Sequence, residues 1–338
     1  MSYAGRFAPT LISRACLRAL AGTLIGGCSF LLAAAPAAAA YPEKAIRIVS
    51  AHAAGGGADT VARTISGPLA RRLGQTVIVE NRPGASTMIG AEYVAQQPAD
   101  GYTLLLATVT TLSINPLFYP NIRYNVEKDF APVANLVSTP FFLGVTAGLP
   151  AKDAAEFVEL VKSKPGALSY GSSGTGTSSH LAGELFNQMA GLQMLHVPYK
   201  ATSTRGTELM AGVINAAFAN DLQAHAQSGK VRLLGVTSAK RLEAFPDVPT
   251  VAESANMPGY EASVWYGLVA PGGTPPDIVK KLNTELVAVL AEPEVRKTLT
   301  EILSGEVVGN TPEEFAAQIK SDAEKWAEVV KRAGIKLQ

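Results

Sequence analysis

The sequence predicts an α/β protein in which two lobes enclose a ligand cleft. Short β-rich runs alternate with helical patterns over most of the chain, which is typical of βα units around a mainly parallel sheet. A second series of such units begins near Phe141, and the pattern after Ser263 returns to one strand followed by helices alone. We therefore expect one lobe built from both ends of the chain and a second lobe inserted between them.

The individual elements follow from hydrophobic periodicity and turn residues. A helix over 60–73 is predicted because Val61, Ile65 and Leu69 recur on one face. Thr250 is expected to start a short helix. Further helices are predicted at 89–97, 154–162, 179–190, after 203, and at 276–290, 293–302 and 312–333, and strands at 46–49, 76–79, 103–107, 142–145, 168–171, 194–197, 215–219, 231–237 and 264–270.

These elements divide the chain into four segments. The crossings near Phe141 and Ser263 are expected to form a hinge, with the ligand bound in the cleft between the lobes. The predicted segments are a signal peptide at 1–40, the first part of lobe 1 at 41–140, lobe 2 at 141–262, and the second part of lobe 1 at 263–338.

The N-terminal segment has the pattern of a secretory signal peptide. Three arginines precede an apolar run over 19–34, and small residues then lead to Ala40. The run is short for a spanning helix, which needs about 20 apolar residues. Cleavage is predicted after Ala40, which would place the mature chain in the periplasm. An alternative makes Cys28 a lipid-attachment site, since Ile25-Gly26-Gly27-Cys28 is a loose lipobox.

Composition excludes several classes of function. Residues 1–40 hold three of the 29 Lys+Arg, none of the 28 Asp+Glu and both cysteines, so the mature chain has a formal net charge of −2 and no cysteine. Disulfides, thiolate nucleophiles and Cys-ligated metals are therefore not available to it. Near-neutral charge argues against nucleic acid as a partner. The four histidines lack metal-ligand spacing, and neither a metal nor a cofactor is expected.

A glycine loop, residues 53–59, follows the first strand. Its glycines let the backbone approach a ligand closely, and the N-terminus of the next helix favours an anion. The alternative is a flexible turn in which Asp59 serves only as the N-cap. The spacing matches neither nucleotide-binding glycine motif. The ligand-binding candidates in this loop are Ala54, Gly55, Gly56, Gly57 and Asp59.

A serine loop, residues 171–179, lies between a later strand and helix. It offers hydroxyls and backbone amides without a fixed charge, which suits a carboxylate that must be released quickly. A serine-hydrolase interpretation would use His180 or His196 as the base, but no GxSxG elbow is present and no acid is placed to orient the base. The candidates here are Ser172, Ser173, Gly174, Thr175 and Ser178, with Thr108 and Thr110 as further candidates after the strand at 103–107.

Short sequence blocks occur in a fixed order along the mature chain. They include Tyr41-Pro42, Val79-Glu80-Asn81-Arg82-Pro83-Gly84, Asp100-Gly101-Tyr102-Thr103-Leu104, His196-Val197-Pro198-Tyr199-Lys200 and Pro246-Asp247-Val248-Pro249-Thr250. With these blocks and the two loops, the mature sequence resembles the Bug (TctC-like) receptors of tripartite tricarboxylate transporters over essentially its whole length. The resemblance implies a two-lobed periplasmic-binding-protein fold of the venus-flytrap, type II-like class. It also implies a receptor, with no catalytic residues, that binds an organic acid and passes it to a two-component membrane permease.

Three departures from the family pattern bear on the ligand. The glycines of the glycine loop follow His52-Ala53-Ala54 instead of prolines, and an acidic residue stands after Asn220, at Asp221, instead of before it. The segment after Lys200 reads Ala201-Thr202-Ser203-Thr204-Arg205 instead of small residues and proline. Thr202, Ser203, Arg205, Asn220 and Asp221 complete the ligand-binding candidates, and the identity of the cargo is not predicted.

Arg205 has two interpretations. It is expected in the first turn of a helix, where the helix dipole disfavours a cation. In the first interpretation, its side chain extends into solvent or pairs with a surface carboxylate such as Glu208. In the second, its guanidinium reaches the cleft and holds the second carboxylate of a dicarboxylate. The receptor is expected to act as a monomer, and a sensor kinase is the alternative partner to the permease.

Overall fold

The computed structural model describes residues 1, 2, 4, 5, 41–199 and 202–335. The chain divides into two compact units, Met1–Tyr41 and Pro42–Gln338. Most of the predicted signal peptide, including Cys28 and the predicted cleavage site after Ala40, lies outside the described residues. The fold below is therefore that of the second unit.

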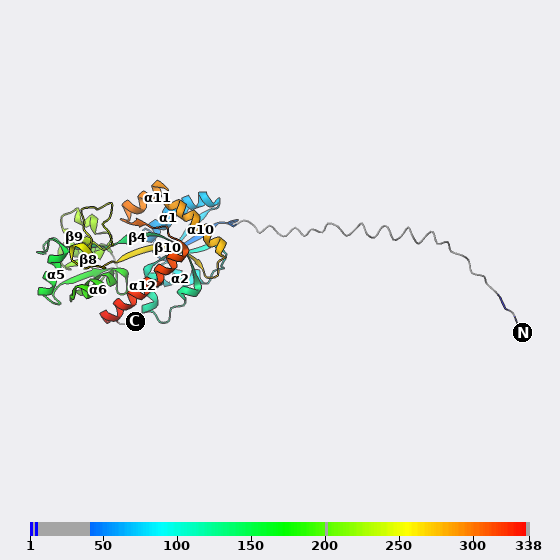
Figure 1. Cartoon of the computed structure of the whole chain (residues 1–338), viewed down its shortest axis with the longest axis horizontal. Coiled ribbons are helices and arrows are strands. Elements are labelled where there is room, and N and C mark those ends of the chain that lie inside the picture. The colour runs from blue at the N-terminus through cyan, green and yellow to red at the C-terminus, as the bar shows by residue number, and fades with distance from the viewer. Residues whose placement is uncertain (3, 6–40, 200–201, 336–338) are drawn as a thin grey trace. The chain divides into compact units, whose positions relative to one another are not determined.

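Two β-sheets form the framework of this unit (Figure 1). The first sheet takes its strands from residues 46–140 and 263–307, and the second from residues 142–236. In spatial order, the first sheet contains β11 (Glu306–Val307), β4 (Phe130–Pro140), β10 (Ser263–Pro271), β3 (Thr103–Thr108), β1 (Ile46–Ser50) and β2 (Val77–Asn81). The second contains β7 (Leu195–Pro198), β6 (Ser169–Ser172), β8 (Ala216–Ala219), β5 (Phe142–Thr146) and β9 (Val231–Val236).

Both sheets are mixed, so the expectation of mainly parallel sheets is wrong. β1 is parallel to β2 and β3, and β6 is parallel to β7 and β8. β10 is antiparallel to β3 and β4, and β5 is antiparallel to β8 and β9. Parallel neighbours require a crossover connection, usually a helix. No helix separates β4 of the first sheet from β5 of the second, because Phe141 alone joins these two strands.

Helices cover the sheets, and their placement follows the predicted faces. In α1 (Gly57–Leu73) the predicted face is buried, and α9 (Val251–Ser254) begins at a capping box made by Thr250 and Glu253, as expected. The remaining helices are α2 (Met88–Ala95), α3 (Asn115–Phe118), α4 (Val126–Asp129), α5 (Ala154–Ser163), α6 (Ser178–Ala190), α7 (Thr202–Ala211), α8 (Leu222–Ala226), α10 (Pro276–Leu290), α11 (Pro293–Lys297) and α12 (Pro312–Ala333), with short helical turns η1 (Ala85–Thr87), η2 (Thr110–Ile114) and η3 (Thr298–Ile302).

The C-terminal helix α12 joins the parts of the molecule that carry the two sheets. Its Phe315 packs edge-to-face on Trp265 of β10, with 5.1 Å between the ring centroids. Gly267 of β10 makes room for that ring, since a Cβ there would lie 2.1 Å from it. At the other end of α12, Val329 O accepts a hydrogen bond of 2.7 Å from Gln188 Nε2 of α6. α12 thus fixes α6, the helix that begins at the end of the serine loop.

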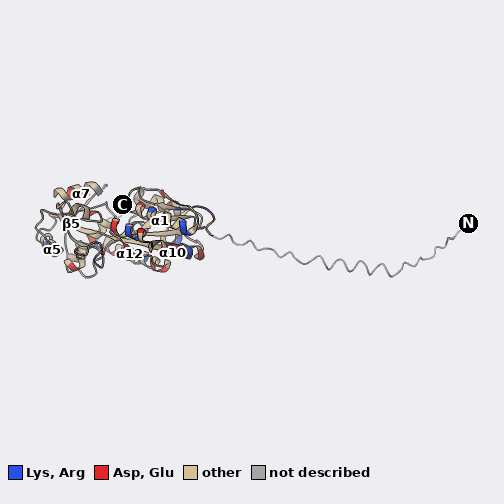
Figure 2. Cartoon of the chain, turned by 90° about the horizontal axis from the view of Figure 1, so that it is seen from above, with Lys and Arg blue, Asp and Glu red and all other residues tan. Residues whose placement is uncertain are grey.

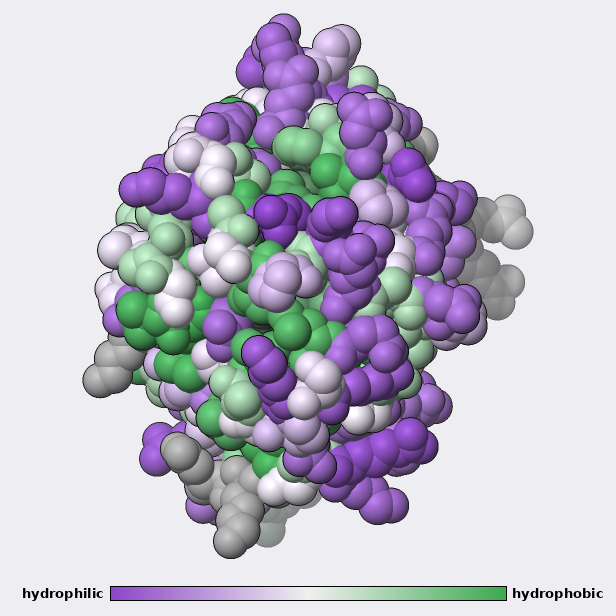
Figure 3. Space-filling view, turned by 90° about the vertical axis from the view of Figure 1, so that its left-hand side faces the viewer, coloured by the Kyte–Doolittle hydropathy of each residue, from purple (hydrophilic) through white to green (hydrophobic). Residues whose placement is uncertain are grey.

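The surface carries both signs of charge. Basic and acidic residues are interspersed along the described chain, as the blue and red segments of the ribbon show (Figure 2). On the face shown in Figure 3, small hydrophobic patches lie between hydrophilic side chains. Among the described residues, none of the helices has the length and apolar character needed to cross a membrane.

Candidate functional site

The glycine loop is held in place by one buried carboxylate. Asp59 accepts hydrogen bonds of 2.9 Å from Gly55 N, Arg63 Nε and Asn81 Nδ2. The hydrogen bond from Arg63 is the main cause that lowers the pKa of Asp59 to about 2. The N-cap of α1 is Gly56, so the interpretation of Asp59 as the N-cap is wrong. Asp59 instead anchors the loop from inside.

The loop presents the N-terminus of α1 at the surface. Ala54, Gly55 and Gly56 are exposed, and no side chain caps the helix. Helix N-termini have backbone N–H groups without an intrahelical partner and carry a partial positive charge. The three residues therefore leave this end of α1 open to an anion.

Tyr266 of β10 lies directly beside this helix end and was not among the predicted residues. A Cβ on Gly57 would be 2.6 Å from the Tyr266 hydroxyl, so only glycine fits between the strand and the helix. Burial raises the pKa of Tyr266 to about 12, which keeps the hydroxyl protonated at neutral pH. The only sequence signal was its place on the strand predicted at 264–270. Its pairing opposite Thr108 became evident only with the strand register.

Thr108 belongs to a buried hydroxyl cluster. Thr111 Oγ1 lies 3.2 Å from Thr108 Oγ1 and 2.9 Å from Thr87 Oγ1. Asn115 Nδ2 donates to Thr87 Oγ1 over 3.3 Å. Thr108 is 2% exposed, whereas Thr110, at the start of η2, is half-buried. Of the two predicted threonines, Thr110 is therefore the more accessible.

The segment before α2 is conformationally strained next to this cluster. Ala85, Ser86 and Thr87 have φ values of 45°, 52° and 78°. Positive φ is costly for residues with a Cβ, and most of all for a β-branched residue such as Thr87. Asn115 Nδ2 holds the segment by donating to Ser86 O over 2.6 Å. No prediction from the sequence covers these three residues.

The serine loop follows β6 and is divided into a buried and an exposed part. Ser172 is fully buried, and its Oγ lies 2.6 Å from His196 Nε2. Thr177 caps α6, and the predicted Ser178 is buried as the first residue of that helix. Ser173 and Thr175 are exposed, with Gly174 half-buried between them. Only the middle of the loop is thus available to a ligand.

The two candidate histidines pack against each other behind this loop. The rings of His180 and His196 stack with 3.8 Å between their centroids, and Gly176 N donates to His180 Nδ1 over 3.1 Å. Burial lowers the pKa of His180 to about 3 and that of His196 to about 4. The Ser172–His196 pair is consequently an internal contact and not an exposed nucleophile.

Arg205 of α7 contacts the serine loop through its guanidinium. Its Nη1 donates to Ser173 Oγ over 3.1 Å and its Nη2 to Asp221 Oδ1 over 2.6 Å. The side chain is 2% exposed, so the interpretation that it extends into solvent is wrong. The proposed pairing with Glu208 is also wrong, because Glu208 accepts a hydrogen bond from the Tyr199 hydroxyl. Gly171 makes room for the arginine, since a Cβ there would lie 3.0 Å from Arg205 Cγ.

The remaining candidates lie near the ends of α7 and β8. Ser203 is exposed in the first turn of α7, and Asn220 is half-buried directly after β8. Thr202 begins α7, and its side chain lies outside the described part of the structure. β6 and β8 are parallel neighbours, so Asp221 and the serine loop follow the same edge of the second sheet.

Two contacts bring the edges of the two sheets together. A Cβ on Gly176 of the serine loop would lie 3.6 Å from the ring of Phe118 in α3. Gln223 Nε2 of α8 lies 3.3 Å from Ser304 Oγ, which follows η3. The neighbouring Leu303 reaches within 3.9 Å of a Cβ placed on Gly57. The glycine loop and the residues around Asp221 are therefore linked through this short chain of contacts.

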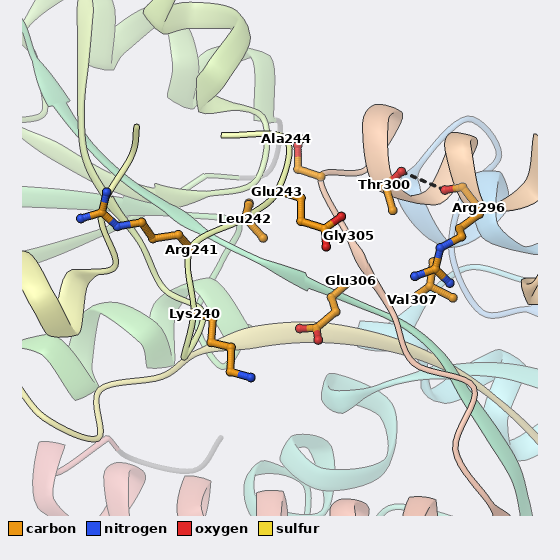
Figure 4. A pocket seen from close by; sticks show the side chains of 11 residues that line it. Lys240, Arg241, Leu242, Glu243, Ala244, Arg296, Thr300, Gly305, Glu306 and Val307 are labelled. Atoms are coloured by element: carbon orange, nitrogen blue, oxygen red, sulfur yellow. Dashed lines mark hydrogen bonds between the residues drawn. The ribbon is translucent and has the colours of Figure 1, made fainter. Parts of the chain in front are cut away.

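A charged groove opens elsewhere, along the segment after β9 and the segment from α11 to β11. It has a volume of about 310 Å³. Figure 4 shows Lys240 and Glu306 turned toward the same space and Arg241 turned away from it. The lining contains no predicted residue, and it mixes both signs of charge. Its residues are Lys240, Arg241, Leu242, Glu243, Ala244, Arg296, Thr300, Ser304, Gly305, Glu306 and Val307.

Comparisons with known proteins agree on one family. Residues 61–335 match the family model described as "Tripartite tricarboxylate transporter family receptor". A solved structure described as that of a periplasmic transporter is 41% identical in sequence and superposes with a TM-score of 0.77. The alignment covers 88% of this chain and 100% of the other.

Two further solved structures are similar and have named ligands. Rpa4515 of R. palustris with adipate is 34% identical, with coverage of 88% and 99% and a TM-score of 0.77. MatC of Rhodopseudomonas palustris with bound malate is 32% identical, with coverage of 86% and 100% and a TM-score of 0.73. These superpositions confirm the predicted α/β fold of periplasmic binding proteins.

Proposed function

Because this chain belongs to the tripartite tricarboxylate transporter receptor family, we propose that it captures a small organic carboxylate in the periplasm and delivers it to a membrane permease. Members of the family are solute-binding receptors, so the chain is not an enzyme. The adipate and malate in two related structures support a carboxylate ligand. Delivery, export and cleavage after Ala40 are parts of the proposal.

The observation that carries the proposal is the open N-terminus of α1. The glycine loop exposes it, and the Tyr266 hydroxyl lies beside Gly57. A carboxylate placed here would accept hydrogen bonds from backbone amides and from a neutral hydroxyl, and the helix dipole favours its charge. The nearby Arg63 is already paired with Asp59. The site therefore binds an anion through neutral donors, which suits a receptor that must release its ligand.

The exposed part of the serine loop supplies the opposing wall. Ser173 and Thr175 present hydroxyls at the edge of the second sheet. A ligand held by both walls would favour closure of the two lobes, because it makes more contacts in the closed state. The hinge is proposed at the two crossings between the sheets. There, Thr237 Oγ1 lies 2.5 Å from Ala262 O and 3.1 Å from Phe141 O, so its one hydroxyl links both crossings.

A thermal-shift screen of aliphatic, aromatic and amino-acid carboxylates tests the function. The purified mature chain should show a concentration-dependent rise in melting temperature with at least one acid, and no turnover of that acid. Solution scattering with the same acid should show a smaller radius of gyration. Identical scattering with and without it would remove lobe closure from the proposal, whereas the lack of any shift across the screen would remove the carboxylate.

A further inference from the structure

In the pair of Arg205 and Asp221, the carboxylate is partly exposed to solvent and the guanidinium is buried. The Arg205 side chain is 2% exposed, and the Asp221 side chain is 40% exposed. Both terminal nitrogens of the guanidinium are engaged by protein oxygens, at Ser173 and Asp221. The cation therefore lies behind the loop, and a ligand approaching from solvent meets the carboxylate first.

Arg205 is committed to a structural role by its surroundings. Its Nε is buried and lacks a partner among the described residues. A buried guanidinium is stable only beside a carboxylate that compensates its charge. Asp221 meets this need with one oxygen, Oδ1. The side chain of Asp221 remains 40% exposed, so it can still accept a hydrogen bond from a second cation.

We propose that Asp221 determines specificity by receiving the ammonium group of an amino-bearing carboxylate, such as an amino acid. The inference rests on the proposed carboxylate site and adds a second contact point to it. An ammonium beside Asp221 would form a charge-assisted hydrogen bond. A second ligand carboxylate at the same place would be repelled by Asp221 and could not displace the buried Arg205. The pair therefore favours an amino acid over the dicarboxylate of the same carbon skeleton.

The position of Asp221 suits a ligand that spans both walls. Asp221 directly precedes α8, and Gln223 of α8 contacts Ser304 at 3.3 Å. Leu303, next to Ser304, lies beside Gly57 at the open end of α1. Ser173, which shares Arg205 with Asp221, is exposed in the serine loop. A ligand with its carboxylate on α1 and its ammonium toward Asp221 would touch both walls.

Matched pairs of acids test this inference by thermal shift and calorimetry. Each pair shares a carbon skeleton and differs in one amino group: L-glutamate with glutarate, L-aspartate with succinate, L-leucine with 4-methylpentanoate, and L-phenylalanine with 3-phenylpropanoate. In the best-binding pair, the amino acid should bind at least about tenfold more tightly than its partner. Asp221→Asn should remove that advantage and leave the affinity for the partner acid within about threefold.

Two further variants separate specificity from structure. Arg205→Met removes the cation and keeps the acid, so the preference for the amino acid should persist, whereas the double variant R205M/D221N should lose it. Glu159→Gln, which removes an exposed charge of α5, is the control and should change neither affinity. Equal losses for both acids in Asp221→Asn, or loss of the preference in Arg205→Met, would overturn the inference. If the acids without an amino group bind as tightly, the inference fails while the carboxylate site stands; if none of the acids binds, both fail.

Discussion

The glycine loop and the serine loop occupy equivalent places, each between a strand and the N-terminus of a helix, but they are built in opposite ways. In the glycine loop, the buried carboxylate of Asp59 fixes the backbone, and the exposed surface carries glycines and an uncapped helix. In the serine loop, the helix is capped by Thr177, and the exposed surface carries hydroxyls. One loop therefore offers backbone donors and the other offers side chains.

The difference assigns separate tasks to the two loops. Backbone amides recognise any carboxylate, so we expect the glycine loop to define the class of ligand. Side-chain hydroxyls and carboxylates differ in the groups that they bind, so we expect the serine loop and the Arg205–Asp221 pair to select within that class. The charged anchor of the glycine loop, Asp59, is buried, whereas the Asp221 side chain in the second region is 40% exposed.

The largest effect is expected from removing the anchor of the glycine loop. Asp59→Ala leaves Gly55 N without its acceptor and Asn81 Nδ2 with only His52 O, so the free energy of unfolding should fall by about 3 kcal/mol. Urea denaturation measures this loss. Arg63→Ala is the control, since Arg63 is exposed and its removal leaves the other two hydrogen bonds of Asp59 intact. A loss below about 1 kcal/mol in Asp59→Ala would show that the loop does not depend on its anchor.

The histidines behind the serine loop should make stability depend on pH. The pKa of His180 is lowered to about 3 and that of His196 to about 4, so both are neutral in the folded protein at pH 5. The unfolded chain binds protons at these sites below about pH 6.5. Stability should therefore be complete above this pH and fall toward pH 4, with a slope approaching about 1.4 kcal/mol per pH unit for each histidine.

Chemical denaturation between pH 7 and pH 4 measures this slope. His180→Gln should reduce it, because one of the two stacked rings is removed. The control is His225→Gln, which removes a histidine of α8 outside the stacked pair. A slope that is the same in the wild-type chain and in His180→Gln would assign the acid sensitivity to other groups.

A smaller effect compares two adjacent glycines of the glycine loop. Gly57→Ala places a Cβ 2.6 Å from the Tyr266 hydroxyl, so it should displace that donor and weaken carboxylate binding by about tenfold. At Gly56 the nearest atom to a Cβ is Ala53 O at 3.6 Å, so Gly56→Ala is the matched control and should have a lesser effect. Calorimetry with the best acid from the screen decides this. Equal affinities of the two variants would exclude Tyr266 from the site.

The smallest effect concerns the strained segment beside the threonine cluster. Ser86 has a φ of 52°, which glycine adopts at lower cost. Ser86→Gly should raise the free energy of unfolding by about 1 kcal/mol, and the hydrogen bond from Asn115 to its backbone oxygen remains possible. Ser86→Ala removes the same hydroxyl but keeps the Cβ, so no gain is expected. A gain in both variants would mean that the hydroxyl, and not the backbone, is unfavourable.

Most helices and strands could be predicted because their signals are local. The buried face of α1 and the capping box before α9 follow directly from spacing along the chain. β4 was missed because Pro132 and Pro140 argue against a strand, yet its neighbour β11 is only two residues long and leaves most of one edge of β4 unpaired. The antiparallel pairings of β4 with β10 and β11 were missed with it. The antiparallel pairs of β10 with β3 and of β5 with β8 and β9 depend on strand order, which periodicity along the chain does not reveal.

The geometry of the candidate site was predicted less completely, because it depends on contacts between distant segments. The glycine loop and the exposed part of the serine loop could be identified from composition alone. Tyr266 and the burial of Arg205 could not, since the first depends on strand register and the second on space left by Gly171. The distinction between anchoring Asp59 and exposed Asp221 likewise required their partners to be known.

The most direct test of the account is a crystal structure of the mature chain with the acid that gives the largest thermal shift. We predict a carboxylate oxygen within about 3 Å of the Gly57 amide and the Tyr266 hydroxyl, with the opposite end of the ligand facing Ser173 and Asp221. A ligand bound instead in the charged groove between Lys240 and Arg296, with the end of α1 unoccupied, would contradict it.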